Sequence, residues 1–506
     1  MLYISLLGTL VGCRAGEADP SGTAPQTVRA ELPVVAADSA VITRLTDEDT
    51  IHDINLYLFG CDNGFSLHLY KDAVSPLRFE CPAGNYTIYA IANMHKDMGY
   101  LTSGQLAACT LTHTESFADL PMTACREVSI QPVTEGILSL PALEVRRCVA
   151  KVAYRITVEP SDISLQSVQA FNLPCCAPLF GEAPPSDDAS AYTSGVRMHA
   201  TSASYFTGRH YQLANPQGAV AAISDQRQKD FEHAPAHASY LLIQALRGAR
   251  VLTYRVYLGE NNTDNFDVRC NTYHQLDITI RGDNEFDTRV SSYTVRVWDD
   301  AEDESFGGYC VQDSQRTLHI QIQSHRNYLP LHAEVAVNRG AGSDLILNGE
   351  AVNDRLLFDL FQTNGTNSYE LNYCPEVFDS TNSVLSYTVA VWDEGGYRQT
   401  FSCQHSYANM LYAYIHDGSE NMGGRGTIEV RGALCEQPLG STRRHRLLLT
   451  DESGCTLRAV PSPGYRFAGW YADRTHTKLL TSDSDYTYNP KRTSDSVFAR
   501  FVKEYD

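Results

Sequence analysis

The sequence has no excess of positive charge and, beyond its first dozen residues, no apolar run long enough to cross a membrane as a helix. Asp and Glu outnumber Lys and Arg by 60 to 40 in the 506 residues, which gives a net charge of −20. Nonspecific binding of nucleic acid and electrostatic docking on anionic lipid both require a basic surface. We therefore expect no nucleic-acid partner.

Motifs of catalysis are also missing. The sequence lacks a Gly-x-Ser-x-Gly elbow, a P-loop, a His-Glu-x-x-His helix and a Cys-x-x-Cys pair. His233 and His237 are four residues apart, but Pro235 between them disfavours the helix that would bring both imidazoles to one metal ion. We expect a non-enzymatic protein with no catalytic residues, no metal site and no cofactor.

Helical periodicity is weak throughout, and only residues 101–109 suggest one or two helical turns. Apolar and polar residues instead alternate strictly in many segments, and aromatic, β-branched and turn-forming residues are abundant. The clearest alternating segments are 54–58, 152–158, 252–258, 276–280 and 318–322. Many short strands separated by turns predict an all-β protein built from sandwiches in series.

The N-terminus has the pattern of a bacterial lipoprotein signal. Residues 2–11 form an apolar run that is too short to span a membrane, and this run leads into Gly12 and Cys13. The polar residues that follow, up to about residue 30, are typical of a tether. We expect Cys13 to be lipidated after export and to become the mature N-terminus, anchored to a membrane by its acyl chains.

One near-repeat occurs in the second half of the chain. Ser292–Asp299 (SYTVRVWD) and Ser386–Asp393 (SYTVAVWD) agree at seven of eight positions and lie 94 residues apart. This match predicts equivalent strands, either in two duplicated units or within one domain. The acidic segment 299–308 that follows the first copy reads as a solvated loop or a joint between domains.

Five segments, in order, carry a family resemblance over about residues 30–285. They are Ile54–Phe59 with the Asp-Asn-Gly turn at 62–64, Gly84–Asn93, Leu120–Thr123, Arg146–Val152 and Tyr254–Tyr273. Each segment has the pattern of a strand followed by a residue that suits a turn. The motifs therefore indicate how the chain folds and packs, and they do not indicate catalysis. Together they resemble the fimbrillin family, the pilus subunits of Bacteroidales bacteria.

The resemblance implies an exported outer-membrane lipoprotein at the cell surface or in a fimbrium, with two transthyretin-like or immunoglobulin-like β-sandwiches. It also implies proteolytic trimming after an arginine and polymerisation with other fimbrial subunits by β-strand exchange. Arg44 precedes the first clear strand and is the expected trimming site, with Arg29 as the second candidate. Both are equally well explained as ordinary arginines of the tether.

The C-terminal residues depart from a plain fimbrillin. The segment from Gly464 to Tyr471, with later Tyr and Phe residues, resembles the internalin B-type repeat of bacterial surface proteins, which implies a small β-grasp-like module. Alternating aromatic residues favour packing in a core. Tyr465 and Trp470 are nevertheless candidates for a surface that binds a host or bacterial ligand.

These expectations give the following domain scheme: signal and lipidation site 1–13, tether 14–30, fimbrillin-like sandwiches 31–145 and 146–285, one or two further β domains 286–420, and the internalin B-type repeat 421–506. About 220 residues follow the second sandwich. A fimbrial tip, anchor or accessory subunit therefore fits better than a repeating shaft subunit.

Two other functions remain open at this point. A glycan-binding surface lipoprotein would need an exposed aromatic platform. A surface hydrolase with an unrecognised site would need acidic side chains that converge in a cleft.

Overall fold

The structure is a computed structural model. It describes residues 26–37, 48–72, 76–182, 184–283, 286–300, 310–311, 316–327, 329–338, 345–347, 350–352, 355–360, 364–375, 384–416, 425–433, 435–438, 444–449, 454–489 and 495–504. Strands dominate these residues, which confirms the all-β expectation, and the helix α1 (Ser103–Ala107) lies where one or two turns were expected. Among the described residues, no helix is both long and apolar enough to cross a membrane.

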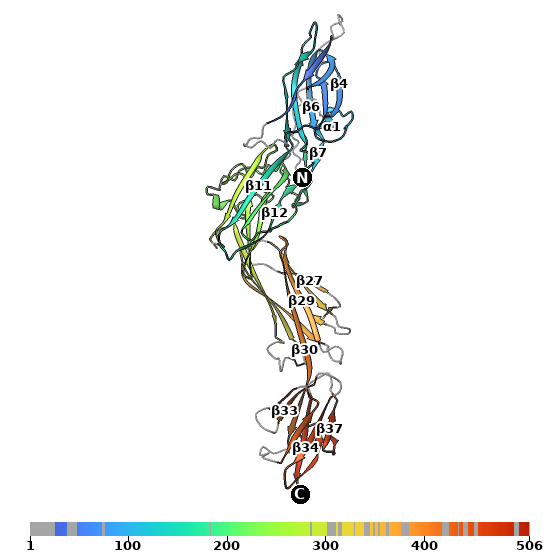
Figure 1. The fold of residues 1–506 in the computed structure, drawn as a ribbon, viewed down its shortest axis with the longest axis vertical. Helices are drawn as coiled ribbons and strands as arrows, with labels where there is room; N and C mark the ends of the chain where they lie inside the picture. Colours follow the sequence, from blue (N-terminus) through green and yellow to red (C-terminus); the bar gives the residue numbers. More distant parts are fainter. Residues whose placement is uncertain are drawn as a thin grey trace, which may run out of the picture.

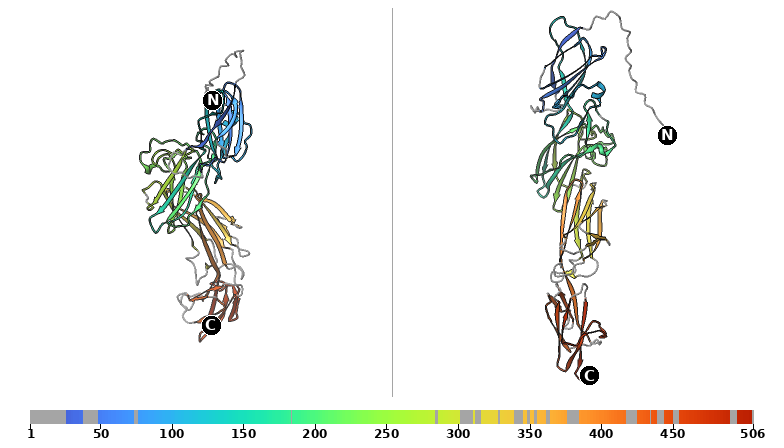
Figure 2. Two further views of the ribbon diagram at one scale, coloured as in Figure 1. Left: turned by 45° about the horizontal axis from the view of Figure 1, so that its top comes forward. Right: turned by 90° about the vertical axis from the view of Figure 1, so that its right-hand side faces the viewer.

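Four β-rich units follow one another along the long axis of the molecule (Figures 1 and 2). We call them the N-terminal sandwich (β1–β10), the second sandwich (β11–β20), the third sandwich (β21–β30) and the C-terminal unit (β31–β38 with the end of β30). Each unit has a buried apolar cluster, and Val251 of the second sandwich also packs in the cluster of the third.

The N-terminal sandwich packs a three-stranded sheet, β5-β1-β9, on a six-stranded sheet, β2-β10-β8-β6-β3-β4. Its strands are β1 (Thr27–Leu32), β2 (Val34–Ala36), β3 (Asp53–Gly60), β4 (Ser66–Asp72), β5 (Leu77–Pro82), β6 (Gly84–Ala92), β8 (Met122–Ile130), β9 (Leu138–Ser139) and β10 (Leu143–Arg147). β7 (Thr110–Thr112) pairs with β14 (Cys176–Pro178) of the second sandwich, so backbone hydrogen bonds cross this junction.

The second sandwich packs the sheet β17-β11-β20 on the sheet β16-β12-β18-β19. Its main strands are β11 (Val149–Val158), β12 (Ser164–Phe171), β16 (Met198–His199), β17 (Tyr205–Leu213), β18 (Tyr240–Arg247), β19 (Arg250–Tyr257) and β20 (Tyr273–Ile280), and β13 (Leu173–Pro174) pairs with β15 (Tyr192–Thr193). The short 3-10 helices Ala189–Ala191 and Gln226–Gln228 lie in its loops.

The third sandwich joins both of its neighbours through continuous sheets. Its strands are β21 (Val290–Asp299), β22 (Cys310–Val311), β23 (Arg316–His325), β24 (Leu331–Asn338), β25 (Leu345–Leu347), β26 (Glu350–Val352), β27 (Arg355–Leu360), β28 (Gly365–Pro375), β29 (Val384–Asp393) and β30 (Arg398–Ile415). The start of β21 pairs with β19, and its later residues pair with β23. β30 pairs first with β29 and then, near its end, with β33 and β38 of the C-terminal unit.

The two copies of the near-repeat are β21 and β29, which lie in opposite sheets of one sandwich and share one core cluster. They are linked reciprocally. The Tyr293 hydroxyl of the first copy donates to Asp393 of the second at 2.7 Å, and the Tyr387 hydroxyl of the second copy donates to Asp299 of the first. The equivalent residues of the repeat therefore form the same buried contact twice.

Asp299 is 5% exposed, so this first residue of the acidic segment 299–308 is not solvated, whereas residues 301–308 lie outside the described residues. The reason is long-range: His405 also hydrogen-bonds the Asp299 carboxylate, at 2.6 Å, from a strand more than 100 residues away. Asp393, the equivalent residue of the second copy, accepts a hydrogen bond of 2.8 Å from the side-chain amide of Gln244 in the second sandwich. Burial raises the pKa of Asp393, although the hydrogen bonds from Tyr293 and Gln244 oppose this shift.

The C-terminal unit encloses Trp470 completely. Its strands are β31 (Gly426–Arg431), β32 (Cys435–Pro438), β33 (Arg444–Leu449), β34 (Cys455–Pro461), β35 (Tyr465–Tyr471), β36 (Leu479–Thr481), β37 (Asp485–Tyr488) and β38 (Asp495–Lys503). The Trp470 side chain is 0% exposed, contacts the rings of Phe467 and Tyr486, and donates from Nε1 to the carbonyl of Ser484 at 3.2 Å.

Replacing this buried indole tests the core of the C-terminal unit. We expect Trp470→Ala to destabilise the unit by about 3–5 kcal/mol, because the substitution leaves a large cavity and an unpaired carbonyl. Calorimetry of the full chain should show one transition shifted to lower temperature. Trp298→Ala, at a residue 39% exposed, is the matched control and should change stability by less than about 1 kcal/mol. Equal effects of the two substitutions would contradict this assignment.

Candidate functional site: the N-terminal strand segment and its clasp

Ten residues near the N-terminus contribute a strand to each sheet of the N-terminal sandwich. β1 lies between β5, to which it is antiparallel, and β9, to which it is parallel. After Pro33 the chain changes sheets, and β2 pairs in parallel with β10 at the edge of the larger sheet. Proline has no N–H to donate, so it suits the point where one ladder ends and the next begins. We call Thr27–Ala36 the N-terminal strand segment.

The inner face of the N-terminal strand segment fills part of the sandwich core. Val28, Ala30, Leu32 and Val34 are each 5% exposed or less. They alternate with outward residues in β1, as expected for a strand with one buried face. If this segment left, the cluster would lose these side chains and both sheets would lose a strand.

The outer face of β1 is held by two ion pairs with β5. Arg29 lies directly opposite Glu80, and Glu31 lies directly opposite Arg78. Their side chains meet at 2.8 Å and 2.9 Å. Opposite charges across neighbouring strands favour this register, but the pairs are largely exposed and each stabilises the fold by less than about 1 kcal/mol.

A second cluster fixes the chain just before β3, and we call it the clasp. The Lys151 ammonium contacts the Glu48 carboxylate at 2.6 Å, the Tyr211 hydroxyl donates to the same oxygen at 2.6 Å, and Arg147 pairs with Asp49. Arg147 and Lys151 are each 9% exposed, so removal of either acidic partner would leave a buried charge without its ion pair. The clasp joins the N-terminal sandwich to β11 and β17 of the second.

Arg147 holds both ends of the chain segment that contains Arg44. Its Nη1 donates to the carbonyl of Ala37 at 3.2 Å, and its Nη2 contacts Asp49. Ala37 also donates its N–H to the carbonyl of Val145 at 2.8 Å. The two flanks of segment 38–47 are therefore fixed at one place, beside the junction of the first two sandwiches.

The clasp sets the ionisation of Glu48. Burial would raise the pKa of this carboxyl, but hydrogen bonds from Lys151 and Tyr211 and the charge of Lys151 outweigh burial and lower the pKa below its ordinary value. Burial and the neighbouring Glu48 raise the pKa of Tyr211, so its hydroxyl stays protonated and able to donate. The clasp is thus complete at neutral pH.

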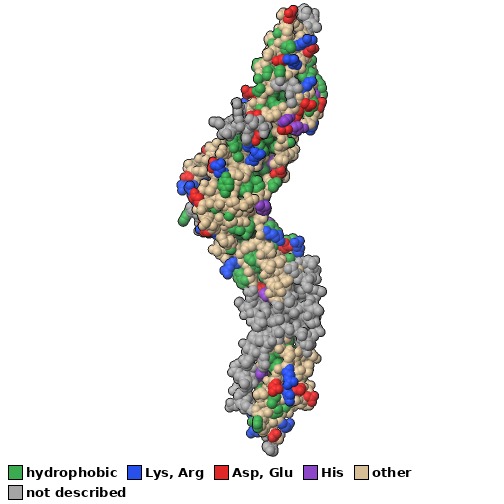
Figure 3. All heavy atoms as spheres, viewed as in Figure 1, with side chains coloured by type: hydrophobic (Ala, Val, Ile, Leu, Met, Phe, Trp, Pro, Cys, Tyr) green, Lys and Arg blue, Asp and Glu red, His purple; other side chains and the backbone are tan. Residues whose placement is uncertain are grey.

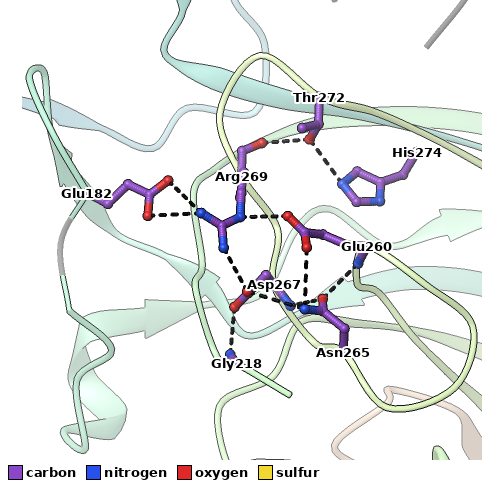
Figure 4. A network of polar contacts seen from close by, with 8 residues as sticks. All are labelled: Glu182, Gly218, Glu260, Asn265, Asp267, Arg269, Thr272 and His274. Atoms are coloured by element: carbon purple, nitrogen blue, oxygen red, sulfur yellow. Dashed lines mark hydrogen bonds and ion pairs between the residues drawn. The ribbon is translucent and has the colours of Figure 1, made fainter. Parts of the chain in front are cut away.

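A polar network around Arg269 supports the clasp from the second sandwich (Figure 4). The Arg269 guanidinium contacts Glu260 at 2.6 Å, Asp267 at 3.2 Å and Glu182 at 3.4 Å. Two residues further along, Asn271 accepts a hydrogen bond of 2.7 Å from Nη1 of Arg147. The network therefore fixes the loop that presents Asn271 to the clasp.

The structure separates the residues proposed from the sequence. Cys13 and Arg44 lie outside the described residues, so lipidation and trimming at these positions stay predictions. Arg29 lies inside β1, where a protease would reach its peptide bond only after the strand left the sheet. Trp470 is fully enclosed and cannot form a binding surface in this structure, whereas Tyr465 is partly exposed beside Arg425.

Sequence reasoning missed the clasp, although one of its signals was present. Arg147 and Lys151 belong to the segment Arg146–Val152, which we interpreted only as a strand of the second sandwich. A lysine among strictly apolar neighbours on a strand is unusual, because burial of an unpaired ammonium is costly. This position alone predicts an acidic partner, but its identity as Glu48 depends on the fold.

The first two sandwiches contain two large clefts. One, of about 610 Å³, lies at the junction of the first two sandwiches and includes Arg126, Arg147 and Cys148 in its lining. The other, of about 640 Å³, follows β19 and β20 and includes Lys229. Burial lowers the pKa of Lys229 to about 8, and its ammonium donates to the carbonyls of Asn261 and Asn265. In the described residues, no three or more His, Cys, Asp or Glu side chains are grouped to hold a metal ion.

Residues 210–278 match a family described as a domain of unknown function, DUF4906. No curated protein matches the sequence. The chain is similar to the solved tip fimbrial protein Mfa3 from Porphyromonas gingivalis, with 15% identity, a TM-score of 0.35, and coverage of 51% of this chain and 97% of that chain. It is also similar to a fimbrilin, FimA, from P. gingivalis W83, with 12% identity, a TM-score of 0.30, and coverage of 53% and 89%.

A third solved structure is the fimbrial anchor protein Mfa2 from P. gingivalis, with 13% identity, a TM-score of 0.25, and coverage of 44% of this chain and 78% of that chain. The solved structures thus include a fimbrillin, the family that the five sequence motifs resemble. The internalin B-type repeat at 421–506 stays a prediction.

The clasp predicts a specific response to acid. Because the pKa of Glu48 is lowered in the folded chain, its stabilising effect is complete above the pKa of the unfolded state, about 4.3, and is lost as pH falls through the folded value. At pH 7, Glu48→Gln should cost about 1–3 kcal/mol, since Lys151 keeps its charge and loses the carboxylate. Thermal unfolding at several pH values measures this cost.

The difference in unfolding temperature between wild type and Glu48→Gln should shrink below pH 4. Glu80→Gln, which removes an exposed partner of Arg29, is the control and should change stability by less than about 1 kcal/mol. A difference that stays constant from pH 7 to pH 3 would refute the role of the Glu48 carboxylate.

Proposed function

We propose that this chain is a non-enzymatic subunit of a surface filament, placed at an end of the filament or beside it, and that it assembles by exchange of the N-terminal strand segment. The observation that carries the proposal is that Thr27–Ala36 supplies a strand to both sheets and precedes a segment, 38–47, whose flanks are fixed. Cleavage after Arg44 would leave the strand segment bound only by non-covalent contacts. An extended strand of a partner subunit then takes its place.

The clasp gives the trimmed chain a fixed new beginning. Cleavage after Arg44 leaves only three residues, 45–47, before Glu48, which Lys151 and Tyr211 hold. Loss of β1 and β2 therefore need not disturb β3, because the chain is tied again before it enters that strand. Cleavage at Arg29 would leave Leu32 and Val34 in place and would not open the groove.

The third sandwich and the C-terminal unit support a position at a filament end. β19–β21 pairing and the long strand β30 join the third sandwich and the C-terminal unit to the second sandwich through backbone hydrogen bonds. The rod in Figure 2 is thus extended, at the end away from the N-terminal sandwich, by sheets whose hydrogen bonding continues from one unit into the next. Such an extension suits a tip, anchor or accessory subunit, exported as a precursor that a lipid at Cys13 holds in the outer membrane until cleavage after Arg44.

The composition of the surface favours protein partners over nucleic acid. On the face drawn in Figure 3, Lys and Arg lie among Asp and Glu and do not gather into a basic patch. This mixed distribution agrees with the net charge of −20. We expect binding to other fimbrial subunits, and to a host or bacterial surface ligand, without catalysis.

Trimming and exchange can be tested on the full chain with trypsin and a peptide. Brief digestion followed by native mass spectrometry should give a chain that begins at Leu45 with the N-terminal fragment still bound. A labelled peptide with the sequence of residues 26–36 should then bind after the fragment is removed with mild denaturant. Arg44→Ala should block both steps, whereas Arg29→Ala should leave them unchanged.

A peptide with Leu32→Asp is the matched control, because a charge at this 0% exposed position cannot enter the core. It should not bind. Equal binding of both peptides, or a trimmed chain that binds neither, would rule out strand exchange through this groove.

A further inference from the structure

The two tryptophans of the near-repeat lie on the two outer faces of the third sandwich, and their surroundings differ. Trp298 in β21 and Trp392 in β29 occupy equivalent positions of the repeat, next to the buried Asp299 and Asp393. Trp298 is 39% exposed and belongs to the large apolar side chains that reach solvent. Trp392 is half-buried.

Side chains that pair with one another cover part of the Trp392 ring. The Arg398 guanidinium lies over its ring at 4.8 Å, and the same guanidinium contacts Glu334 at 2.8 Å. The His332 ring lies 5.7 Å away and pairs with Asp359 at 2.7 Å. Polar groups beside this tryptophan are thus engaged with one another.

The Trp298 ring is supported by one neighbouring side chain and is otherwise more exposed to solvent than the Trp392 ring. His319 stacks on its ring, with centroids 5.0 Å apart and planes within 11°, and so supports it from the neighbouring strand. Arg296 lies 5.6 Å from the ring centroid and is exposed. In the part of the chain that the structure describes, no carboxylate forms an ion pair with Arg296.

The strands beside Trp298 carry polar side chains in three rows. The rows follow the registers of β21, β23 and β28 and read Trp298–His319–Glu370, Arg296–Gln321–Ser368 and Thr294–Gln323–Thr366. Strands are about 4.8 Å apart and alternate residues along a strand about 7 Å, so the field measures about 10 Å by 14 Å. We call these nine residues the Trp298 face.

The Trp298 face combines one aromatic ring with many neutral hydrogen-bonding groups. Gln321 and Gln323 each offer an amide donor and acceptor, and Thr294, Ser368 and Thr366 offer hydroxyls. A pyranose ring presents an apolar C–H face bounded by hydroxyls. An aromatic ring with a negative π face attracts such C–H groups, while side-chain amides and charged groups bind the hydroxyls.

We propose that the Trp298 face binds a neutral glycan, with a sugar ring stacked on Trp298 and its neighbours along the polymer hydrogen-bonded to the rows of Arg296, Gln321 and Gln323. The length of the field fits two or three sugar units. This binding site is independent of strand exchange, because it lies in the third sandwich and uses no residue of the N-terminal strand segment.

The charge and apolar content of the face favour a neutral glycan over other ligands. His319 lies 3.6 Å from the Glu370 carboxylate, and the face holds one guanidinium, that of Arg296, and one carboxylate, so its formal charges cancel. The whole chain carries a net charge of −20, which repels acidic polymers. A protein partner would require an apolar centre of several residues. Trp298 is the one large apolar side chain of the nine residues.

Affinity electrophoresis of the full chain tests the proposal. Native gels that contain hydroxyethylcellulose, laminarin, yeast mannan or galactan serve as neutral probes, and polygalacturonate serves as the acidic probe. At least one neutral polysaccharide should retard the wild type. Trp298→Ala should weaken the retention about tenfold or more, because it removes the stacking surface.

The repeat provides a matched control in the same fold. Trp392→Ala alters the equivalent position of the other sheet and should retain binding. Gln321→Leu, which keeps Trp298, should weaken binding at least threefold, since it removes an amide from the centre of the field. The proposal would be overturned if no neutral polysaccharide retarded the wild type, or if polygalacturonate alone did so. It would also be overturned if a neutral polysaccharide retarded wild type and Trp298→Ala equally.

Fluorescence gives a second readout that loss of folding cannot imitate. The chain has three tryptophans, and Trp298 is the most exposed of them. A bound sugar should shift the emission of the wild type and of Trp392→Phe. The shift should be absent in Trp298→Phe, and a shift of unchanged size in that variant would show that the sugar binds elsewhere.

Discussion

Backbone pairing across the boundaries of the units is the constraint on which the rest of the structure depends. A strand at a sheet edge leaves N–H and C=O groups without partners, so edges must be paired or covered. Here β19 pairs with β21, β7 pairs with β14, and β30 passes from the third sandwich into the C-terminal unit. Sheets, rather than flexible linkers, therefore hold the rod together, and any groove that opens must be filled by another strand.

The sequence was sufficient to predict the strands but not their partners. Period-two alternation identified β11, β19, β20 and β23, because a strand with one buried face leaves that pattern locally. Burial of Asp299 could not be predicted this way, since Tyr387 and His405 come from strands 88 and 106 residues away. The near-repeat did contain the information: Tyr and Asp recur at the same two positions, and the fold brings each Tyr to the other Asp.

The aromatic residues show why exposure is harder to predict than secondary structure. Trp470 looked like a candidate for binding, yet it is fully buried, and the rings of Phe467 and of Tyr486 in β37 pack against it. Trp298 and Trp392 share one motif, but Arg398 covers Trp392 because Glu334, on the neighbouring strand β24, holds that arginine in place. Which tryptophan remains open thus depends on a residue outside the motif.

The N-terminal strand segment shows how the backbone constraint becomes a driving force for assembly. Burial of Val28, Leu32 and Val34 stabilises the sandwich by about 1.5–3 kcal/mol for each side chain. A whole domain is stable by only about 5–15 kcal/mol, so the sandwich without this segment is close to unfolding or must recruit a replacement. The replacement needs apolar side chains at alternate positions, with a small one where Ala30 lies, because Ala30 is 1% exposed within the packed core cluster. Specificity for a donor strand therefore resides in the sizes of the side chains in the groove, while backbone hydrogen bonds supply affinity that any extended strand could use.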